Sequence, residues 1–461
     1  MPAKTPNAHL ADHLAEAGIS RGGLAHRINT LAVRRGLPAP RFNHASVARW
    51  LRGEQPRGRT PDLIAEVLSV PLGRTVTRAD IGMRSALPVA DLGLSFESDL
   101  NTAVVAASDL YATDAHRRAT LTRSAYTSVG FVVPAIRWMT APAADLMDRA
   151  GSRRVGGANI IAIREVTSTF RRLDNMFGGG YARSTVVQYL ADEVSPLLRH
   201  GAYTADVGRE LFSAAAEMTL LAGWMAFDLE QHPIAQRYLI QALRLAQAGG
   251  DVALGAETLA AMSCQAGYLG EGADAVDMAR AAHRSARRSG SAALMAETLV
   301  TEAHGHALTG DQRACAVALT GAETAFDRSR PGGEPAWLQY FDGAYLSAKT
   351  GRALLDASDA PRSADAMRLS LDMKGGFERG HVFNLALLAG ALLDSGRVDE
   401  GCAIALHAIE SADGIASERV NGELAAVAGR LERYGDFAPA REALAALPTA
   451  RRGGRGRRAT R

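Results

Sequence analysis

The chain has 461 residues, of which 47% are hydrophobic, 6% aromatic and 22% charged, and its formal net charge is +3. This length exceeds what one hydrophobic core supports, so we expect two or three domains. Alternating β-branched and polar residues are rare, which predicts an all-α fold. No apolar run approaches the roughly 18 residues of a membrane span. With no secretion signal at its start, the sequence predicts a cytoplasmic protein without a membrane partner.

The net charge conceals an asymmetry along the chain. Residues 1–84 contain 13 Lys and Arg against 6 Asp and Glu, a net charge of +7, and residues 451–461 add six Arg without an acid. The body between these ends therefore carries −10. Neutralisation of phosphates supplies most of the non-specific affinity for DNA, so this pattern is typical of a protein whose basic ends contact DNA. The tail, residues 448–461, is equally compatible with a disordered solubilising end.

The first helix-forming pattern lies in residues 18–35. Ser20 can cap a helix whose apolar positions Leu24, Ile28 and Leu31 recur at helical spacing. This pattern predicts the first helix of a helix-turn-helix.

A second helix follows, capped by Asn43 and ended by Gly53. Val47, Trp50 and Leu51 form an apolar stripe on this predicted helix. The opposite direction holds arginines, whose guanidinium groups suit guanine edges and phosphates. The predicted DNA contacts in and around the two helices are Ser20, Arg21, Asn43, His44, Ala45, Ser46, Arg49, Arg52, Arg57 and Arg59.

Three stretches of this region, LAHRIN, SVARWLRGEQPR and TPDLIAEVLSVPLG, resemble the N-terminal domain of actinobacterial Xre-type regulators, which are lambda-repressor-like. A later stretch, VTSTFRRLDNMFGGGYARSTVVQYL, resembles the helical middle region of the same regulators, among them negative regulators of differentiation and antibiotic production. The resemblance implies a helix-turn-helix domain followed by a tetratricopeptide-like region. One departure is that residues 36–43 separate the two helices, where the usual motif has a turn of about 3–4 residues.

The remaining chain divides by composition. Residues 1–82 form the predicted DNA-binding domain, which ends after a helix begun by Pro61. Residues 83–97 have the Pro, Gly and Ser content of a linker. A helical middle region is predicted for 98–210, with glycine-rich breaks near 151–157 and 177–181.

Residues 211–447 contain an internal repeat of helical pairs. A small or compact residue recurs near the start of each second helix at spacings of 40, 40, 49, 37 and 39 residues, and the unit near Ala364 fits poorly. These registered positions are Ala235, Ala275, Cys315, Ala364, Gly401 and Ala440. Stacked helical pairs create a concave surface that binds peptides, proteins or another subunit.

Catalytic and metal-binding patterns are weak. The glycines of FGGGYARS lack the Lys-Ser/Thr of a P-loop and follow no apolar strand, so they predict a turn between helices. His304 and His306 are two residues apart and point to different sides of a helix, so they do not chelate one metal together. Cys264, Cys315 and Cys402 are isolated, which predicts buried reduced thiols. We therefore expect a protein that is not an enzyme and holds no cofactor.

Two functions fit these patterns. The first is a transcriptional regulator, a repressor or a pleiotropic regulator, that binds double-stranded DNA as a homodimer. Its helical repeats would supply the dimer contact and bind a peptide, a small molecule or a protein as effector. The alternative is an interaction scaffold that has lost DNA affinity. The retained Arg49, Arg52, Arg57 and Arg59 favour the regulator.

Overall fold

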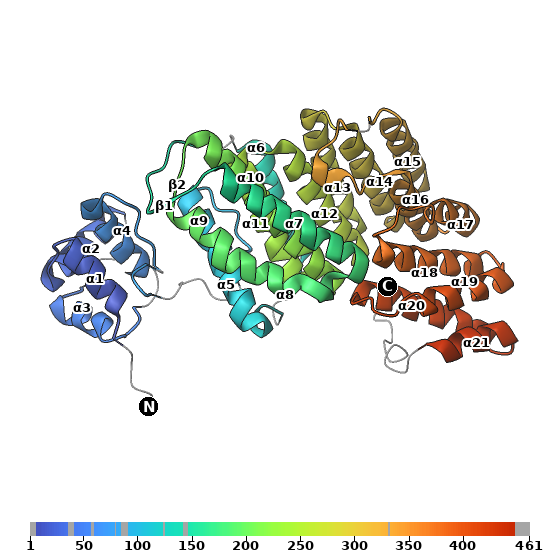
Figure 1. Cartoon of the computed structure of the whole chain (residues 1–461), viewed down its shortest axis with the longest axis horizontal. Coiled ribbons are helices and arrows are strands. Elements are labelled where there is room, and N and C mark those ends of the chain that lie inside the picture. The colour runs from blue at the N-terminus through green and yellow to red at the C-terminus, as the bar shows by residue number, and fades with distance from the viewer. Residues whose placement is uncertain are drawn as a thin grey trace. The chain divides into compact units, whose positions relative to one another are not determined.

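The computed structural model describes residues 6–35, 41–56, 60–78, 80–83, 91–122, 125–141, 146–330 and 332–447. The described chain is built from α-helices, which confirms the all-α prediction, and its paired strands are the two-residue strands β1 (Arg153–Arg154) and β2 (Gly201–Ala202). It divides into two compact units, Met1–Leu92 with Ala150–Ser152, and Gly93–Arg149 with Arg153–Arg461. Each unit is described by itself (Figure 1).

The first unit contains four helices. Their bounds are α1 Ala8–Glu16, α2 Arg21–Arg34, α3 His44–Leu51 and α4 Thr60–Leu72. Both predicted caps are confirmed: the Ser20 side chain accepts a hydrogen bond from the backbone N–H of Gly23, and Asn43 closes a capping box with Ser46. Pro61 lies in the first turn of α4, where its missing N–H costs nothing.

The core of this unit comes from the predicted apolar stripes. Leu24 and Ile28 of α2 are fully buried, as are Val47 of α3 and Ile64 of α4, and Trp50 is 3% exposed. These side chains belong to one continuous apolar cluster that includes α1. The helices are therefore held by burial of their apolar faces, which contributes more than helix propensity alone.

The second unit contains the remaining helices. Their bounds are α5 Leu100–Thr122, η1 Ser128–Phe131, α6 Val132–Thr140, α7 Gly157–Phe177, α8 Gly179–Tyr189, the π-helix η2 Leu190–Val194, α9 Ser195–His200, α10 Ala205–Asp228, α11 His232–Gly249, α12 Val252–Tyr268, α13 Gly272–Ser289, α14 Ala292–Leu308, α15 Gln312–Phe326, η3 Ala336–Leu338, α16 Gly343–Asp356, α17 Ala360–Leu369, α18 Glu378–Asp394, α19 Val398–Glu410, α20 Glu418–Leu431, η4 Glu432–Tyr434 and α21 Ala438–Ala446. From α10 onward they stack as antiparallel pairs into a solenoid (Figure 1).

The predicted repeat register is confirmed. Each of the six registered positions, Ala235, Ala275, Cys315, Ala364, Gly401 and Ala440, lies in a second helix of a pair and is buried. The long spacing of 49 residues has a local cause, because the segment that includes η3 is inserted between α15 and α16.

The turns within the pairs share one geometry. From α10 to α19, each pair is joined by three residues, and the middle residue has positive φ: 55° at Glu230, 85° at Gly270, 77° at Gly310, 65° at Ser358 and 79° at Gly396. Positive φ favours glycine because a Cβ is strained there. Glu230 and Ser358 take the place of glycine in two of these turns. Because the turn before Ala364 has Ser358 and no glycine, a repeat pattern based on glycine fits that pair poorly.

The middle region does not stand apart from the repeats. Asp114 of α5 accepts hydrogen bonds from Arg183 of α8, at 2.5 Å, and from Tyr238 of α11, at 2.9 Å. All three side chains are buried, and a buried ion pair of this kind requires all its partners. The segments predicted as separate, 98–210 and 211–447, thus form one unit.

The second part of the predicted linker also belongs to that unit. The backbone carbonyl of Gly93 accepts a hydrogen bond from Gln241, and that of Glu97 accepts one from Arg244. Phe96 is 2% exposed. Residues 93–97 are therefore anchored on α11, whereas 84–90 and the tail 448–461 lie outside the described residues.

The glycine run between α7 and α8 forms the predicted turn between helices. A Cβ at Gly178 would lie 2.7 Å from the carbonyl oxygen of Ala416, and one at Gly179 would lie 2.5 Å from that of Met225. The N–H of Gly180 donates to Ala416, at 2.9 Å. Glycine is required here because backbones approach this closely, and α7 consequently contacts both α10 and α18.

Candidate functional site

The predicted DNA face centres on α3. His44, Arg49 and Arg52 are exposed, while Val47 and Trp50 on the same helix are buried. An arrangement with one anchored side and one basic exposed side is what groove reading by a helix requires. Figure 1 shows α3 among the helices of the first unit.

The other predicted contacts have different environments. Ser20, Arg21 and Asn43 are exposed, although Ser20 and Asn43 also cap helices, and Ala45 is half-buried. Ser46 is 6% exposed and its hydroxyl takes part in the α3 capping box, so this burial argues against a DNA contact. Arg57 and Arg59 lie outside the described residues.

Arg49 interacts with an acid of its own unit. Its Nε lies 3.7 Å from Oε1 of Glu54, and the two side chains are 48% and 45% exposed. Its Nη2 donates to Oγ of Ser46 at 3.4 Å. Because such exposed pairs contribute at most about 1 kcal/mol, Arg49 can exchange this partner for a phosphate or a base.

Asn29 was not singled out from the sequence, yet it fixes the start of α3. Its Oδ1 accepts from the N–H of Phe42 at 3.1 Å, and its Nδ2 donates to the carbonyl of Phe42 at 3.0 Å. The Phe42 ring packs edge-on against Trp50, with ring centroids 5.1 Å apart. These contacts place α3 against α2 although the connection between the helices is long.

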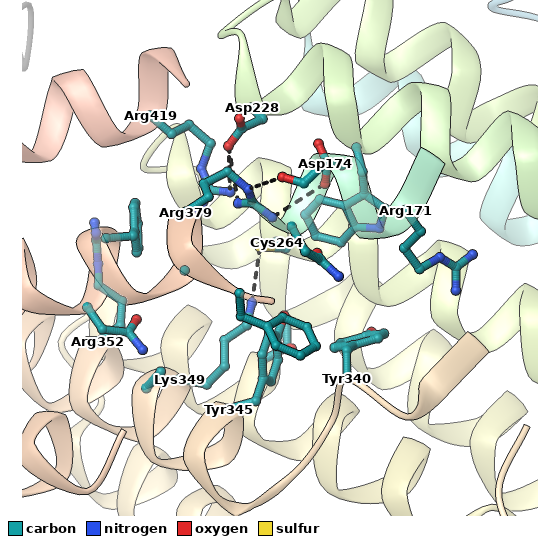
Figure 2. Close-up of a pocket in the computed structure, with 18 of the residues that line it drawn as sticks. Arg171, Asp174, Asp228, Cys264, Tyr340, Tyr345, Lys349, Arg352, Arg379 and Arg419 are labelled. Atoms are coloured by element: carbon teal, nitrogen blue, oxygen red, sulfur yellow. Dashed lines mark hydrogen bonds and ion pairs between the residues drawn. The ribbon is translucent and has the colours of Figure 1, made fainter. Parts of the chain in front are cut away.

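A cavity of about 220 Å³ lies among the first helices of the solenoid pairs (Figure 2). It is lined by first helices of successive pairs, α10, α12, α14, α16, α18 and α20, and by α7. Its aromatic lining consists of Trp224, Tyr268, Trp337, Tyr340, Tyr345, Phe377 and Phe383. Its charged or titratable lining consists of Arg171, Asp174, Asp228, Glu257, Cys264, His304, Lys349, Arg352, Arg379 and Arg419.

Arg379 joins three helices at one end of the cavity. Its Nη1 lies 3.3 Å from Oδ1 of Asp228, and its Nη2 lies 3.4 Å from Oδ2 of Asp174, as the dashed lines in Figure 2 show. Asp228 also accepts from the N–H of Gly179 and from Ser417. Burial raises the pKa of Asp174 to about 6, against the effect of Arg379 and with a further contribution from Asp228.

Arg419 is surrounded by rings. Its guanidinium carbon lies 4.5 Å from the ring centroid of Phe227, 4.8 Å from that of Phe383 and 5.4 Å from that of Tyr268. Its nearest carboxylate contact among the described residues is Oδ1 of Asp228, at 4.0 Å. Stacking on aromatic faces therefore supplies much of its stabilisation.

Arg352 is fully paired. It lies 2.6 Å from Oδ2 of Asp356 and 2.7 Å from Oε1 of Glu423. His304 also contacts Asp356, at 2.9 Å, while His306 contacts Glu302 at 3.4 Å. Burial raises the pKa of Asp356, but Arg352 and His304 together hold it below its usual range. The two histidines point to different partners, as their spacing predicted.

Two buried carboxyl groups, those of Glu257 and Glu297, contact the hydroxyl of Tyr340, which lines the cavity. Tyr340 Oη lies 2.8 Å from Oε1 of Glu257 and 2.9 Å from Oε1 of Glu297. Burial, and then the charge of Glu257, raises the pKa of Glu297 well above its usual range. The pair therefore favours holding a proton over carrying two negative charges.

Lys349 and Cys264 face each other across the cavity wall. The ammonium donates to Sγ of Cys264 at 3.3 Å and lies 5.6 Å from the ring centroid of Tyr345 (Figure 2). Cys264 is half-buried and lines the cavity, whereas Cys315 and Cys402 are buried, so the expectation of buried thiols is wrong for Cys264.

Sequence patterns did not identify the cavity residues. The contacts of Arg379 with Asp174 join positions 205 residues apart, and those of Arg352 with Glu423 join positions 71 apart. The sequence does contain one signal for the cavity: charged residues occur on the otherwise apolar first helices of the solenoid pairs. Among the described residues, no group of three or more His, Cys, Asp or Glu side chains is placed to hold a metal ion. Within the same described ranges, no helix combines the length and apolarity needed to cross a bilayer.

A family model matches the N-terminal part of the chain. Residues 10–84 match the family model of the SP15 N-terminal domain, a span that begins in α1 and includes α2, α3 and α4. No curated protein matches the chain. The matched span lies within the first compact unit, Met1–Leu92.

Proposed function

We propose that this protein is an effector-responsive transcriptional regulator that binds double-stranded DNA. The observation that carries the proposal is the division of α3 into a buried side, with Val47 and Trp50, and an exposed side with Arg49 and Arg52. The lambda-repressor-like sequence pattern and the net charge of +7 over residues 1–84 support it.

The chemistry of the α3 surface fits a duplex. Arginine presents two parallel N–H donors that match the O6 and N7 acceptors of guanine, and it also binds phosphate. The N-terminus of α3, where His44 is exposed, is the positive end of the helix dipole, which favours a phosphate. In this proposal Arg49 and Arg52 read bases or phosphates in the major groove, and Trp50 positions them.

The solenoid has the second role in this proposal. The cavity among its first helices is the effector site, and the second unit joins two copies of the chain so that two α3 helices meet half-sites one helical turn apart. Because a single reading helix covers few base pairs, a dimer provides the necessary specificity.

The test measures DNA binding by the full chain. Fluorescence anisotropy with a labelled duplex of random sequence should give affinity that falls steeply as salt rises, with a log–log slope of roughly −0.9 per phosphate neutralised. The double variant Arg49→Ala, Arg52→Ala should bind at least about tenfold more weakly, since each arginine contact is worth roughly 1–3 kcal/mol.

The matched control is Arg362→Ala, which removes an arginine with a 68% exposed side chain from α17. This variant should bind DNA as the unmodified chain does. Selection from a random duplex pool should enrich a two-fold symmetric motif. No binding at low salt, or equal losses for the control and the double variant, would refute the proposed DNA face.

A further inference from the structure

The charges in the cavity are unequally compensated. Three cations of its wall have carboxylate partners: Arg171 lies 2.9 Å from Glu217, Arg352 contacts Asp356 and Glu423, and Arg379 contacts Asp174 and Asp228. These arginines are therefore neutralised by the protein itself.

Lys349 is different. Within the described ranges it forms no ion pair with a carboxylate, and its hydrogen-bond partner is the sulfur of Cys264, a weak acceptor, at 3.3 Å. In the nearby carboxyl pair, Glu257 and Glu297 each direct one oxygen to the hydroxyl of Tyr340 rather than to Lys349. Burial disfavours the ammonium, while its neighbours Cys264, Tyr345 and Glu297 offset this effect and raise the pKa of Lys349. An anion in the cavity would give this retained positive charge a direct partner.

Arg419 adds to the imbalance at the other end. Its nearest described carboxylate is 4.0 Å away, and its Nε is buried without a hydrogen-bond partner. Lys349 and Arg419 are thus the two cations of the cavity lining that have no carboxylate closer than 4.0 Å among the described residues.

The space between these cations is aromatic. Trp224 of α10, Trp337 of η3, Tyr345 of α16, and Tyr340 and Phe377 of the connecting segments line the cavity together. Flat rings pack well against such walls, and apolar lining with few polar groups is typical of sites for small organic ligands. At about 220 Å³ the space is too large for a single water and suits a compact ligand.

We infer that the cavity binds a small organic anion with an aromatic or other flat apolar body, whose acidic group pairs with Lys349. The inference deepens the effector role in the proposed function and rests on it only for its regulatory meaning. Acids of the wall are partly offset, because Arg379 pairs with Asp174 and Asp228, and burial raises the pKa of Glu297 and so favours its neutral form.

Two fluorescent probes that differ by one charge test the inference on the full chain. 8-Anilinonaphthalene-1-sulfonate is an aromatic anion, and N-phenyl-1-naphthylamine has the same rings without the sulfonate. The anionic probe should bind saturably at one site. Lys349→Met should lower the affinity for the anionic probe by about tenfold or more, the usual effect of removing one partner of a buried charge pair. The affinity for the neutral probe should not change.

Lys374→Met is the matched control because Lys374 is exposed and outside the cavity lining. Its affinity for both probes should stay the same, and circular dichroism with thermal melting shows that each variant is folded. If Lys349→Met does not fold, Lys349→Gln retains a polar head and serves in its place.

Three outcomes would overturn the inference: no binding of the anionic probe to the folded chain, equal affinity of Lys349→Met and the unmodified chain, or parallel losses for both probes. The probes do not require DNA. A chain that binds duplex but not the anionic probe refutes only this inference, whereas the reverse result refutes only the proposed DNA binding.

Discussion

At the residue scale, two carboxyl groups, Glu257 and Glu297, lie buried where an ionised form is disfavoured. Glu257 and Glu297 are 2% and 3% exposed, and each keeps one oxygen without a hydrogen-bond partner. The hydroxyl of Tyr340 has one proton to donate to the two carboxyl groups. Two ionised carboxyl groups that share one hydroxyl partner repel each other, so the pair favours holding a proton.

This shared proton makes stability depend on pH. Since the pKa of Glu297 is raised on folding, its contribution is fully present below the unfolded value, about 4.5, and is lost as pH rises toward the folded value. Glu297→Gln keeps a hydrogen-bonding side chain without the charge. The free energy of unfolding of this variant, minus that of the unmodified chain, should therefore increase as pH rises from about 5 to 9.

Urea denaturation at several pH values measures this difference. Glu410→Gln is the control, because Glu410 is exposed on α19, and its difference from the unmodified chain should not change with pH. A constant difference for Glu297→Gln as well would mean that Glu257 and Glu297 do not share a proton.

At the element scale, the turns of the helical pairs determine where each pair closes. The middle residue of the turn has positive φ whether it is Gly310 or the exposed Ser358. Apart from its two neighbours along the chain, no residue has an atom within 4 Å of a Cβ built on Gly310, so backbone strain is what opposes a side chain there.

Opposite substitutions at these two turns should have opposite signs. Gly310→Ala introduces a side chain at positive φ and should lower the free energy of unfolding by about 1 kcal/mol, whereas Ser358→Gly relieves strain and should raise it by a smaller amount. Thermal melting of both variants measures the effect. Gly429→Ala, within α20, is the control and should stabilise slightly, because alanine favours a helix. Destabilisation by Ser358→Gly would contradict the strain argument.

At the scale of the whole molecule, the proposed dimer needs an apolar contact on the second unit. Val129, Val132, Val133 and Ile136, which we call the α6 stripe, lie at helical spacing on η1 and α6 and are 70%, 36%, 54% and 55% exposed. Neighbouring exposed apolar side chains of this kind are typical of interfaces. We propose that a second copy of the chain covers the α6 stripe.

Light scattering on the full chain tests this assignment. The unmodified chain should have the mass of a dimer, and Ile136→Glu should shift it toward a monomer, because a charge would be buried in the contact. Val317→Glu alters an isolated valine on α15 that is 67% exposed and should leave the dimer intact. A monomeric unmodified chain, or a dimer unaffected by Ile136→Glu, would contradict the proposed contact.

The sequence by itself determined what depends on neighbours along the chain. Helical spacing and caps such as Ser20 and Asn43 act within one or two turns, and the repeat spacing records the same packing at Ala235, Ala275 and Cys315. Those features predicted the helices, their pairing and the buried side of α3.

Only the tertiary structure decided which distant residues meet. The middle region joins the repeats through contacts such as that of Asp114 with Tyr238, and the predicted linker joins them through that of Gly93 with Gln241. Ser46 is buried, and its hydroxyl takes part in the α3 capping box. The cavity needs Lys349, Arg379 and Arg419 from three helices to face one space. Helical periodicity tells which side of a helix is buried but not which helix lies opposite, because that depends on how the turns stack one pair on the next.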